Sequence, residues 1–154
     1  KKPYRGARPP DAAAAAVGGG AGGAFWALAG RCFEDREEGQ GAGGAGYVYT
    51  VCPYRRVEQQ EVRGRRAHGA AVHLGRGMHW EEVNKVLVST GGDKCPGIGP
   101  RKTRIEFSCG LEDKVLEVSE YEMCSYLVSF ETPAACIISD DEADTDVDQT
   151  LRII

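Results

Sequence analysis

Five short runs of the chain show the alternation of hydrophobic and polar residues that is typical of β-strands. Their apolar residues are mostly β-branched or aromatic, and clusters of Gly, Pro, Asp or Glu bound each run. Ile105 and Phe107 alternate with charged neighbours, and Tyr126, Val128 and Phe130 share one face of another run. The runs are "YVYTVC" (47–52), "KVLVST" (85–90), "TRIEFSC" (103–109), "KVLEVS" (114–119) and "SYLVSFET" (125–132). The pattern predicts an antiparallel all-β fold, a barrel or a two-sheet sandwich, with Ile105, Phe107, Val128 and Phe130 buried.

Little of the sequence predicts helix. The segment "WEEVNKV" (80–86) fits a turn or two of helix, and the five alanines at 12–16 fit one further turn. The loop "GGDKCPGIGPR" (91–101) contains four Gly and two Pro, so it continues neither a strand nor a helix. It therefore places Arg101 at the start of the strand that follows.

The two ends of the chain have compositions that predict no core of their own. Residues 1–23 are Pro-rich and then Ala/Gly-rich, which indicates an extended arm. The segment 139–154 carries six acidic side chains between Asp140 and Asp148, which indicates a solvated tail. We therefore expect one domain over residues 24–138, between an arm and an acidic tail.

The number and spacing of the cysteines indicate whether they bind a metal or form disulfides. There are six: Cys32, Cys52, Cys95, Cys109, Cys124 and Cys136. None forms a C-x-x-C pair, and His68, His73 and His79 share one Gly/Arg-rich stretch, so the spacing argues against a zinc site. We expect no metal or other cofactor. An even number of cysteines in a small domain instead indicates three disulfides and an oxidising compartment. Fifteen pairings are open to six cysteines, and their spacing alone selects none.

The hydropathy of the chain predicts no transmembrane segment, because no stretch of about twenty strongly apolar residues occurs. Residues 12–30 follow basic residues, but their Ala and Gly make them too weakly hydrophobic for the core of a signal peptide. The chain starts with Lys1 and has a formal net charge of −4. We interpret it as a processed or partial product whose targeting signal is missing, and we expect no nucleic acid partner.

Four stretches, in this order and spacing, resemble the mannose 6-phosphate receptor homology (MRH) domain, the module of P-type lectins and of several glycan-processing proteins. They are "CF" (32–33), "YVYTVCPYRRVEQ" (47–59), "GGDKCPGIGPRKTRIEFSCG" (91–110) and "VSEYEMCSYLVSFETPAAC" (118–136). The resemblance covers residues 32–136 and all six cysteines, and segment 60–84 matches poorly. It implies a disulfide-stapled flattened barrel or two-sheet sandwich, with the pairs Cys32–Cys52, Cys95–Cys124 and Cys109–Cys136.

Two members of this family are similar at the C-terminal end of the match. The segment "TPAAC" (132–136) resembles the glucosidase II β subunit, and "FETP" (130–133) is shared with the phosphotransferase γ subunit as well. The resemblance to the β subunit also implies a Trp directly after the third cysteine, where it supports the sugar site. This chain has Pro96 there instead.

The resemblance implies a mannose site. The family uses a Gln after the second cysteine, an Arg before the fourth, and a Glu and a Tyr that flank the fifth. At the matching positions this chain has Gln59, Arg101, Glu120 and Tyr126, with Tyr47 as a further candidate. Hexose hydroxyls both donate and accept, so a selective site needs rigid groups of both kinds. The Arg101 guanidinium donates from a planar fork, the Glu120 carboxylate accepts, and the Gln59 amide does both.

The function implied is that of a mannose-recognising lectin domain of the secretory pathway, in the endoplasmic reticulum or Golgi lumen, or outside the cell. It would act in N-glycan processing or quality control as an accessory subunit, with a high-mannose N-glycan and a protein, a catalytic subunit or an assembly neighbour, as partners. No acid and nucleophile motif supports an enzyme. Lys94 and Lys102 match no phosphate-site position, which favours unphosphorylated mannose. The alternative is a structural or assembly protein that keeps the fold without binding sugar.

Overall fold

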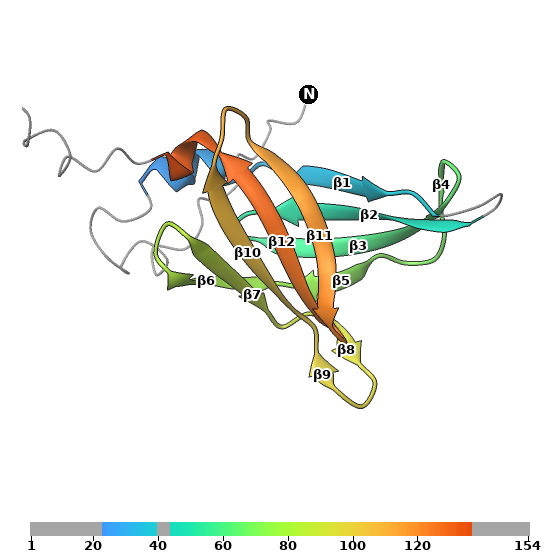
Figure 1. Cartoon of the computed structure of the whole chain (residues 1–154). Helices are drawn as coiled ribbons and strands as arrows, with labels where there is room; N and C mark the ends of the chain where they lie inside the picture. The colour runs from blue at the N-terminus through green and yellow to red at the C-terminus, as the bar shows by residue number, and fades with distance from the viewer. Residues whose placement is uncertain (1–22, 40–43, 137–154) are drawn as a thin grey trace, which may run out of the picture.

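The computed structural model of the chain describes residues 23–39 and 44–136. Two five-stranded sheets pack against each other, and a small two-stranded hairpin projects at one end (Figure 1). The expected all-β, two-sheet architecture is therefore confirmed. The expected arm up to residue 22 and the acidic tail lie outside the described residues.

The strands divide cleanly between the two sheets. The first contains β1 (Phe33–Glu37), β2 (Ala45–Cys52), β3 (Arg56–Arg63), β4 (Arg66–Ala67) and β5 (Val72–Gly75). The second contains, in spatial order, β11 (Lys114–Glu122), β12 (Ser125–Thr132), β10 (Lys102–Cys109), β7 (Val86–Thr90) and β6 (Gly77–Glu82). The hairpin consists of β8 (Lys94–Cys95) and β9 (Gly99–Pro100), and short 3₁₀ helices flank the sheets, η1 (Ala24–Leu28) and η2 (Pro133–Ala135).

The core lies between the sheets and is closed at one end by η1. Its most deeply buried side chains, none more than 1% exposed, include Phe25, Leu28, Val51, Val57, Leu74, Leu87, Ile105, Val128 and Phe130. Burial of Ile105, Val128 and Phe130 is as predicted from the period of two. Phe107, which was also predicted to be buried, is only half-buried, because it lies at the rim of the core. The centre of its ring lies 5.0 Å from that of Phe25.

One pairing departs from the predicted antiparallel arrangement. Strands β10 and β12 run parallel, with Thr103 opposite Tyr126 and Ile105 opposite Val128. The antiparallel partners are β11 for β12 and β7 for β10. Because parallel neighbours begin at the same end of a sheet, the residue before β10, Arg101, lies beside the start of β12.

The segment predicted to form a helical turn, 80–86, is instead the tip of the β6–β7 hairpin. Trp80 pairs with Leu87 across it, and the turn passes through Asn84, whose φ of 64° lies in the left-handed region. Asn tolerates this conformation better than most residues. The Trp80 ring packs edge-on against Phe25, 5.2 Å between ring centres, so tertiary packing decides the strand.

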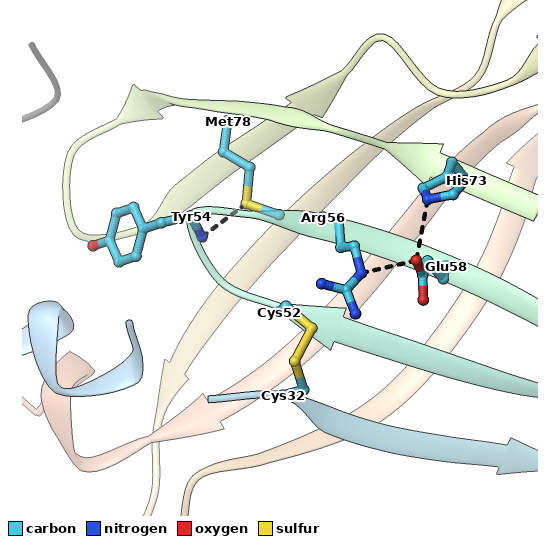
Figure 2. Close-up of a disulfide and its surroundings, with 7 residues drawn as sticks. All are labelled: Cys32, Cys52, Tyr54, Arg56, Glu58, His73 and Met78. Atoms are coloured by element: carbon cyan, nitrogen blue, oxygen red, sulfur yellow. Dashed lines mark hydrogen bonds and ion pairs between the residues drawn. A yellow bond between two sulfur atoms is a disulfide. The ribbon is translucent and has the colours of Figure 1, made fainter. Parts of the chain in front are cut away.

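Three disulfides join Cys32 to Cys52, Cys95 to Cys124 and Cys109 to Cys136, the pairs that the resemblance implies. The first links Cys32, which precedes β1, to Cys52, the last residue of β2 (Figure 2). The second ties the β8–β9 hairpin to the β11–β12 turn, and the third ties the end of β10 to the residue after η2. The second and third therefore anchor opposite ends of β10 and β12.

Two negative findings concern the part of the chain that the structure describes. No group of three or more His, Cys, Asp or Glu side chains is arranged to hold a metal ion there. Nor does any helix within those residues have the length and hydropathy to cross a membrane.

Asp113, in the β10–β11 turn, anchors that turn to two other parts of the fold. Its Oδ1 accepts a 2.7 Å hydrogen bond from the Thr132 hydroxyl, and its Oδ2 lies 2.7 Å from Nη1 of Arg31. The hydrogen bond from Thr132 and the nearby Arg31 guanidinium hold the pKa of the Asp113 carboxyl below its usual range. Because the folded state lowers this pKa, the carboxylate stabilises the fold above about pH 4 and ceases to do so as the pH falls through the lowered pKa.

Replacement of Asp113 by Asn is therefore expected to lower the free energy of unfolding at neutral pH by about 1 kcal/mol. The difference from the parent should shrink as the pH falls from about 4, where the unfolded chain becomes protonated, through the lowered pKa of the folded parent. Urea denaturation of both proteins between pH 2 and pH 7 measures this difference. A gap that stays constant over this range would contradict the role assigned to the ionised carboxylate.

Candidate functional site

The sequence-predicted residues come from both sheets. Gln59 lies on β3 and Tyr47 on β2, whereas Glu120 and Tyr126 lie on β11 and β12. Arg101 directly precedes β10. Glu120 and Tyr126 are directly opposite each other in the β11–β12 pair. Parallel pairing of β10 with β12 brings Arg101 to the same end of the second sheet.

Tyr126 links the two charged residues of the second sheet. Its side chain is almost fully buried, and burial raises the pKa of its phenol. Hydrogen bonding to Arg101 acts to lower that pKa, whereas the negative charge of Glu120 raises it. Tyr126 therefore lies opposite Glu120 in the strand pair and at the same end of the sheet as Arg101.

The Arg101 guanidinium is held by its own loop. Nη1 donates to the main-chain carbonyls of Asp93 and Lys94, at 3.2 and 2.8 Å. Its Nε is buried and has no acceptor among the described residues. A buried donor without a partner is uncommon and calls for an explanation, and binding sites are one place where it occurs. The guanidinium is thus fixed in orientation while part of its donor capacity is unused.

One oxygen of the Glu120 carboxylate is held by the main chain. Its Oε1 accepts a 3.0 Å hydrogen bond from the main-chain N–H of Cys124, which closes the β11–β12 turn. The residue as a whole is exposed, so its carboxylate is accessible from solvent. A carboxylate fixed through one oxygen presents the other in a defined position.

On the first sheet, Gln59 meets a residue that the sequence did not single out. Its Nε2 donates a 3.1 Å hydrogen bond to the hydroxyl of Tyr49, which lies directly opposite on β2. The rings of Tyr47 and Tyr49 lie 6.3 Å apart. The "CPYR" turn between the strands fixes this register. Counting residues back from Gln59 across that turn therefore identifies Tyr49 as the residue opposite it.

Tyr49, on the first sheet, lies in the core between the two sheets. Burial raises its pKa to about 12, Glu37 contributes in the same direction, and the hydrogen bond from Gln59 acts to lower it. Tyr126 also raises the pKa of Tyr49, and both residues belong to the core cluster between the sheets. Gln59 is thus bonded to a tyrosine that belongs to the same buried cluster as Tyr126, the strand partner of Glu120. We refer to Gln59, Tyr49, Tyr126, Arg101 and Glu120 as the tyrosine-centred cluster.

A separate cavity of about 690 Å³ lies at the edge of the first sheet. Its lining includes Arg36, Glu37, Val62 and Arg65. None of the five sequence-predicted residues contributes to it. The cavity meets the tyrosine-centred cluster at Glu37, whose Oε2 accepts a 3.5 Å hydrogen bond from the Tyr49 hydroxyl.

The buried phenols predict a late alkaline transition. Tyr49 and Tyr54 both have pKa values raised to about 12 by burial. A raised folded-state pKa means that these phenols stabilise the fold below about pH 10, and that this contribution is lost as the pH rises towards 12. Ultraviolet titration of phenolate should show a late-ionising group that disappears in Tyr49→Phe. Ionisation of all phenols near pH 10 in the folded protein would contradict the burial of these hydroxyls.

Comparisons with known proteins bear on this cluster. The family model described as "Glucosidase II beta subunit-like protein" matches residues 23–152. Glucosidase 2 subunit beta of Oryza sativa subsp. japonica is 30% identical over 128 residues, which are 83% of this chain and 18% of that protein. The N-acetylglucosamine-1-phosphotransferase subunit gamma of Homo sapiens is 31% identical over 112 residues, 71% of this chain and 34% of that protein. The chain thus spans less than a fifth of the first relative and about a third of the second.

A solved structure shares the fold. The MRH domain of Yos9, in a structure described as complexed with alpha3,alpha6-Man5, superposes with a TM-score of 0.53 at 19% identity. The superposition covers 73% of this chain and 82% of that one. At this identity the likeness establishes the MRH fold.

Proposed function

Because the chain belongs to the glucosidase II beta subunit-like family, we propose that its β-domain is a lectin module that binds terminal mannose of high-mannose N-glycans. We assign the sugar contacts to Gln59, Arg101, Glu120 and Tyr126, with Tyr47 at the edge of the site. The domain is an accessory module that holds a glycan and carries out no reaction itself.

The observation that carries this proposal is the placement of polar residues around one buried tyrosine pair: Gln59 is bonded to Tyr49, whereas Arg101 and Glu120 lie at the end of the second sheet where β12 begins with Tyr126. These residues come from separate strands of two sheets, and packing of the core does not require their polar ends to meet. Together they supply a cation, an anion, an amide and neutral phenols. A pyranose ring with adjacent hydroxyls needs this mixture of donors and acceptors.

The departure at Pro96 supports a site that rests on polar contacts. Pro96 is exposed in the β8–β9 hairpin, at the position where the resemblance implies a Trp. Without that ring, the site loses an aromatic contact and depends more on its hydrogen bonds. We therefore expect weak binding of single mannose residues, with useful affinity when several glycan branches engage several copies.

The family and the three disulfides support a place in the oxidising secretory pathway. The named relatives are subunits, so we propose that the protein acts beside a partner protein that it brings to glycoproteins. The catalytic activity would reside in that partner.

A glycan array probed with the purified protein tests this function. The proposal predicts binding to oligomannose glycans with exposed terminal mannose, and none to the same glycans capped by other sugars. Preference for mannose 6-phosphate would replace the assignment of unphosphorylated mannose. Absence of binding to every mannose glycan would contradict the lectin proposal and favour the structural or assembly role.

A further inference from the structure

Asp93, in the segment that carries Arg101, makes several hydrogen bonds to the end of β5, and Gly91 adds one through its carbonyl, which accepts from Nη1 of Arg76 at 3.0 Å. The Asp93 carboxylate accepts a 2.9 Å hydrogen bond from the main-chain N–H of His73 through Oδ2. Its Oδ1 lies 2.7 Å from Nη2 of Arg76. The Asp93 N–H in turn donates to the His73 carbonyl at 2.7 Å. The main chain of Asp93 is therefore hydrogen-bonded to β5, and its carboxylate is bonded both to β5 and to Arg76, the residue that follows this strand.

The main-chain carbonyl of the same residue binds Arg101. The Asp93 carbonyl accepts from the main-chain N–H of Arg101 at 3.1 Å and from its guanidinium at 3.2 Å. The neighbouring Gly92 N–H donates to the Arg101 carbonyl at 2.9 Å. Asp93 is thus the one described residue that bonds both β5 and the Arg101 guanidinium.

The attachment continues to the strand that carries Gln59. His73 Nε2 lies 3.1 Å from Oε1 of Glu58, and the same Oε1 accepts from Nε of Arg56 at 2.8 Å (Figure 2). Glu58 and His73 are directly opposite in the β3–β5 pair, and Gln59 is the next residue of β3. The contacts therefore run from the Gln59 strand, through His73 and Asp93, to the Arg101 side chain.

From this arrangement we propose that Asp93 is a positioning residue for the sugar site: its carboxylate sets where the Arg101 guanidinium lies relative to Gln59. The inference rests on the proposed lectin function, because it assigns Asp93 a part in the affinity of that site. Asp93 needs no contact with the sugar. It acts through the loop carbonyls that orient Arg101.

The two bonds of the carboxylate should contribute unequally. The Arg76 and Asp93 side chains are 50% and 37% exposed, so their ion pair is screened and contributes little. The hydrogen bond from the His73 N–H is the one that fixes the loop. The amide oxygen of Asn can accept this bond, whereas Ala leaves the N–H without its partner. The two substitutions should therefore have different effects.

A matched control exists at the other end of the fold. Like Asp93, Asp113 accepts one neutral hydrogen bond and pairs with one Arg, but its partners are Thr132 and Arg31. Asp113→Ala should cost stability in a similar way without reaching Arg101. A general loosening of the fold and a specific displacement of Arg101 can thus be told apart.

The experiment measures two properties of the full chain for the parent, Asp93→Ala, Asp93→Asn and Asp113→Ala. One is affinity for methyl α-mannoside, and the other is the NMR resonance of the Arg101 Nε–H, assigned through its absence in Arg101→Lys. Asp93→Ala should lose about tenfold in affinity, as expected for loss of one hydrogen bond to a charged group, and should shift or broaden the Arg101 resonance. Asp93→Asn should retain affinity within about threefold. Asp113→Ala should match the parent in both.

Parent-like affinity and an unchanged Arg101 resonance in Asp93→Ala would overturn the inference. So would an equal loss of affinity in Asp113→Ala, since it would show a general effect of stability. Should the parent bind no mannoside, the lectin proposal fails by itself. The resonance would then still decide whether Asp93 positions the Arg101 side chain.

Discussion

Replacement of Arg101 by alanine is expected to abolish measurable mannose binding. Arg101 is the one cation of the tyrosine-centred cluster, and its guanidinium is oriented by two carbonyls while its Nε has no acceptor among the described residues. A hydrogen bond from a charged donor contributes about 1.5 to 3 kcal/mol, and a guanidinium makes two to adjacent hydroxyls. Their loss corresponds to at least a hundredfold weaker binding, on the order of 3 kcal/mol. Isothermal titration with an oligomannose glycan measures it.

The same substitution also removes bonds within the fold. Since Arg101 ties its loop to the Asp93 and Lys94 carbonyls, Arg101→Ala should lower the free energy of unfolding by about 1 to 2 kcal/mol. Arg104→Ala is the matched control, because Arg104 lies three residues further on and pairs with the exposed Glu81. It should bind mannose like the parent. The assignment of the site would be contradicted if the Arg101→Ala variant bound mannose, or if the Arg104→Ala variant failed to bind it.

The second large effect is expected from removing the disulfide beside the site. Cys95–Cys124 closes a loop of 29 residues, and it joins the hairpin before Arg101 to the turn after Glu120. The double replacement Cys95→Ala and Cys124→Ala should cost about 3 to 4 kcal/mol of stability in the chain-entropy model. It should also weaken mannose binding at least about tenfold, because the segment that carries Arg101 is then no longer linked covalently to the β11–β12 turn beside Glu120. Denaturant unfolding and titration measure the two effects.

Cys109–Cys136 supplies the control for this result. Its loop spans 27 residues, so its removal should destabilise the fold by a similar amount. Cys109 stands eight residues after Arg101, about 25 Å along the strand. Mannose affinity of the folded double variant should stay within about twofold of the parent. Equal losses of affinity in both double variants would show that the disulfides act only through overall stability.

The strands that bury one face were predictable because their side chains alternate. Ile105, Val128 and Phe130 are all buried as the period of two requires. Strands β1 and β3 were missed for the opposite reason. "FEDRE" and "RVEQQEVR" are rich in charged and amide side chains and bury few positions, so they lack a regular hydrophobic face. Their strand conformation comes from pairing with β2, which lies between them.

The direction of β12 relative to β10 could not be read from the sequence. Alternation gives the same pattern for parallel and antiparallel strands. The parallel pairing follows from β11, which occupies the other edge of β12 and returns the chain to the end where β10 began. This pairing sets Arg101 beside Tyr126, so the site depends on a feature that no local pattern encodes.

The candidate site itself was predictable only through the family resemblance. Taken singly, Gln59, Arg101 and Glu120 are residue types that usually face solvent. Tyr49 shows the limit of the resemblance, because none of the family positions that it supplies falls on Tyr49. Counting residues across the β2–β3 turn identifies it, and it is the residue that bonds Gln59 and shares the core cluster with Tyr126.

The most direct test of the account is an NMR titration of the isotope-labelled parent with methyl α-mannoside. The account predicts that the largest changes fall on the Gln59 side-chain amide, the Arg101 Nε–H and the main-chain amides around Glu120 and Tyr126. Amides of the β6–β7 hairpin should not change. No change up to high mannoside concentrations, or changes confined to a surface that lacks Arg101, would contradict the claim that this cluster binds mannose.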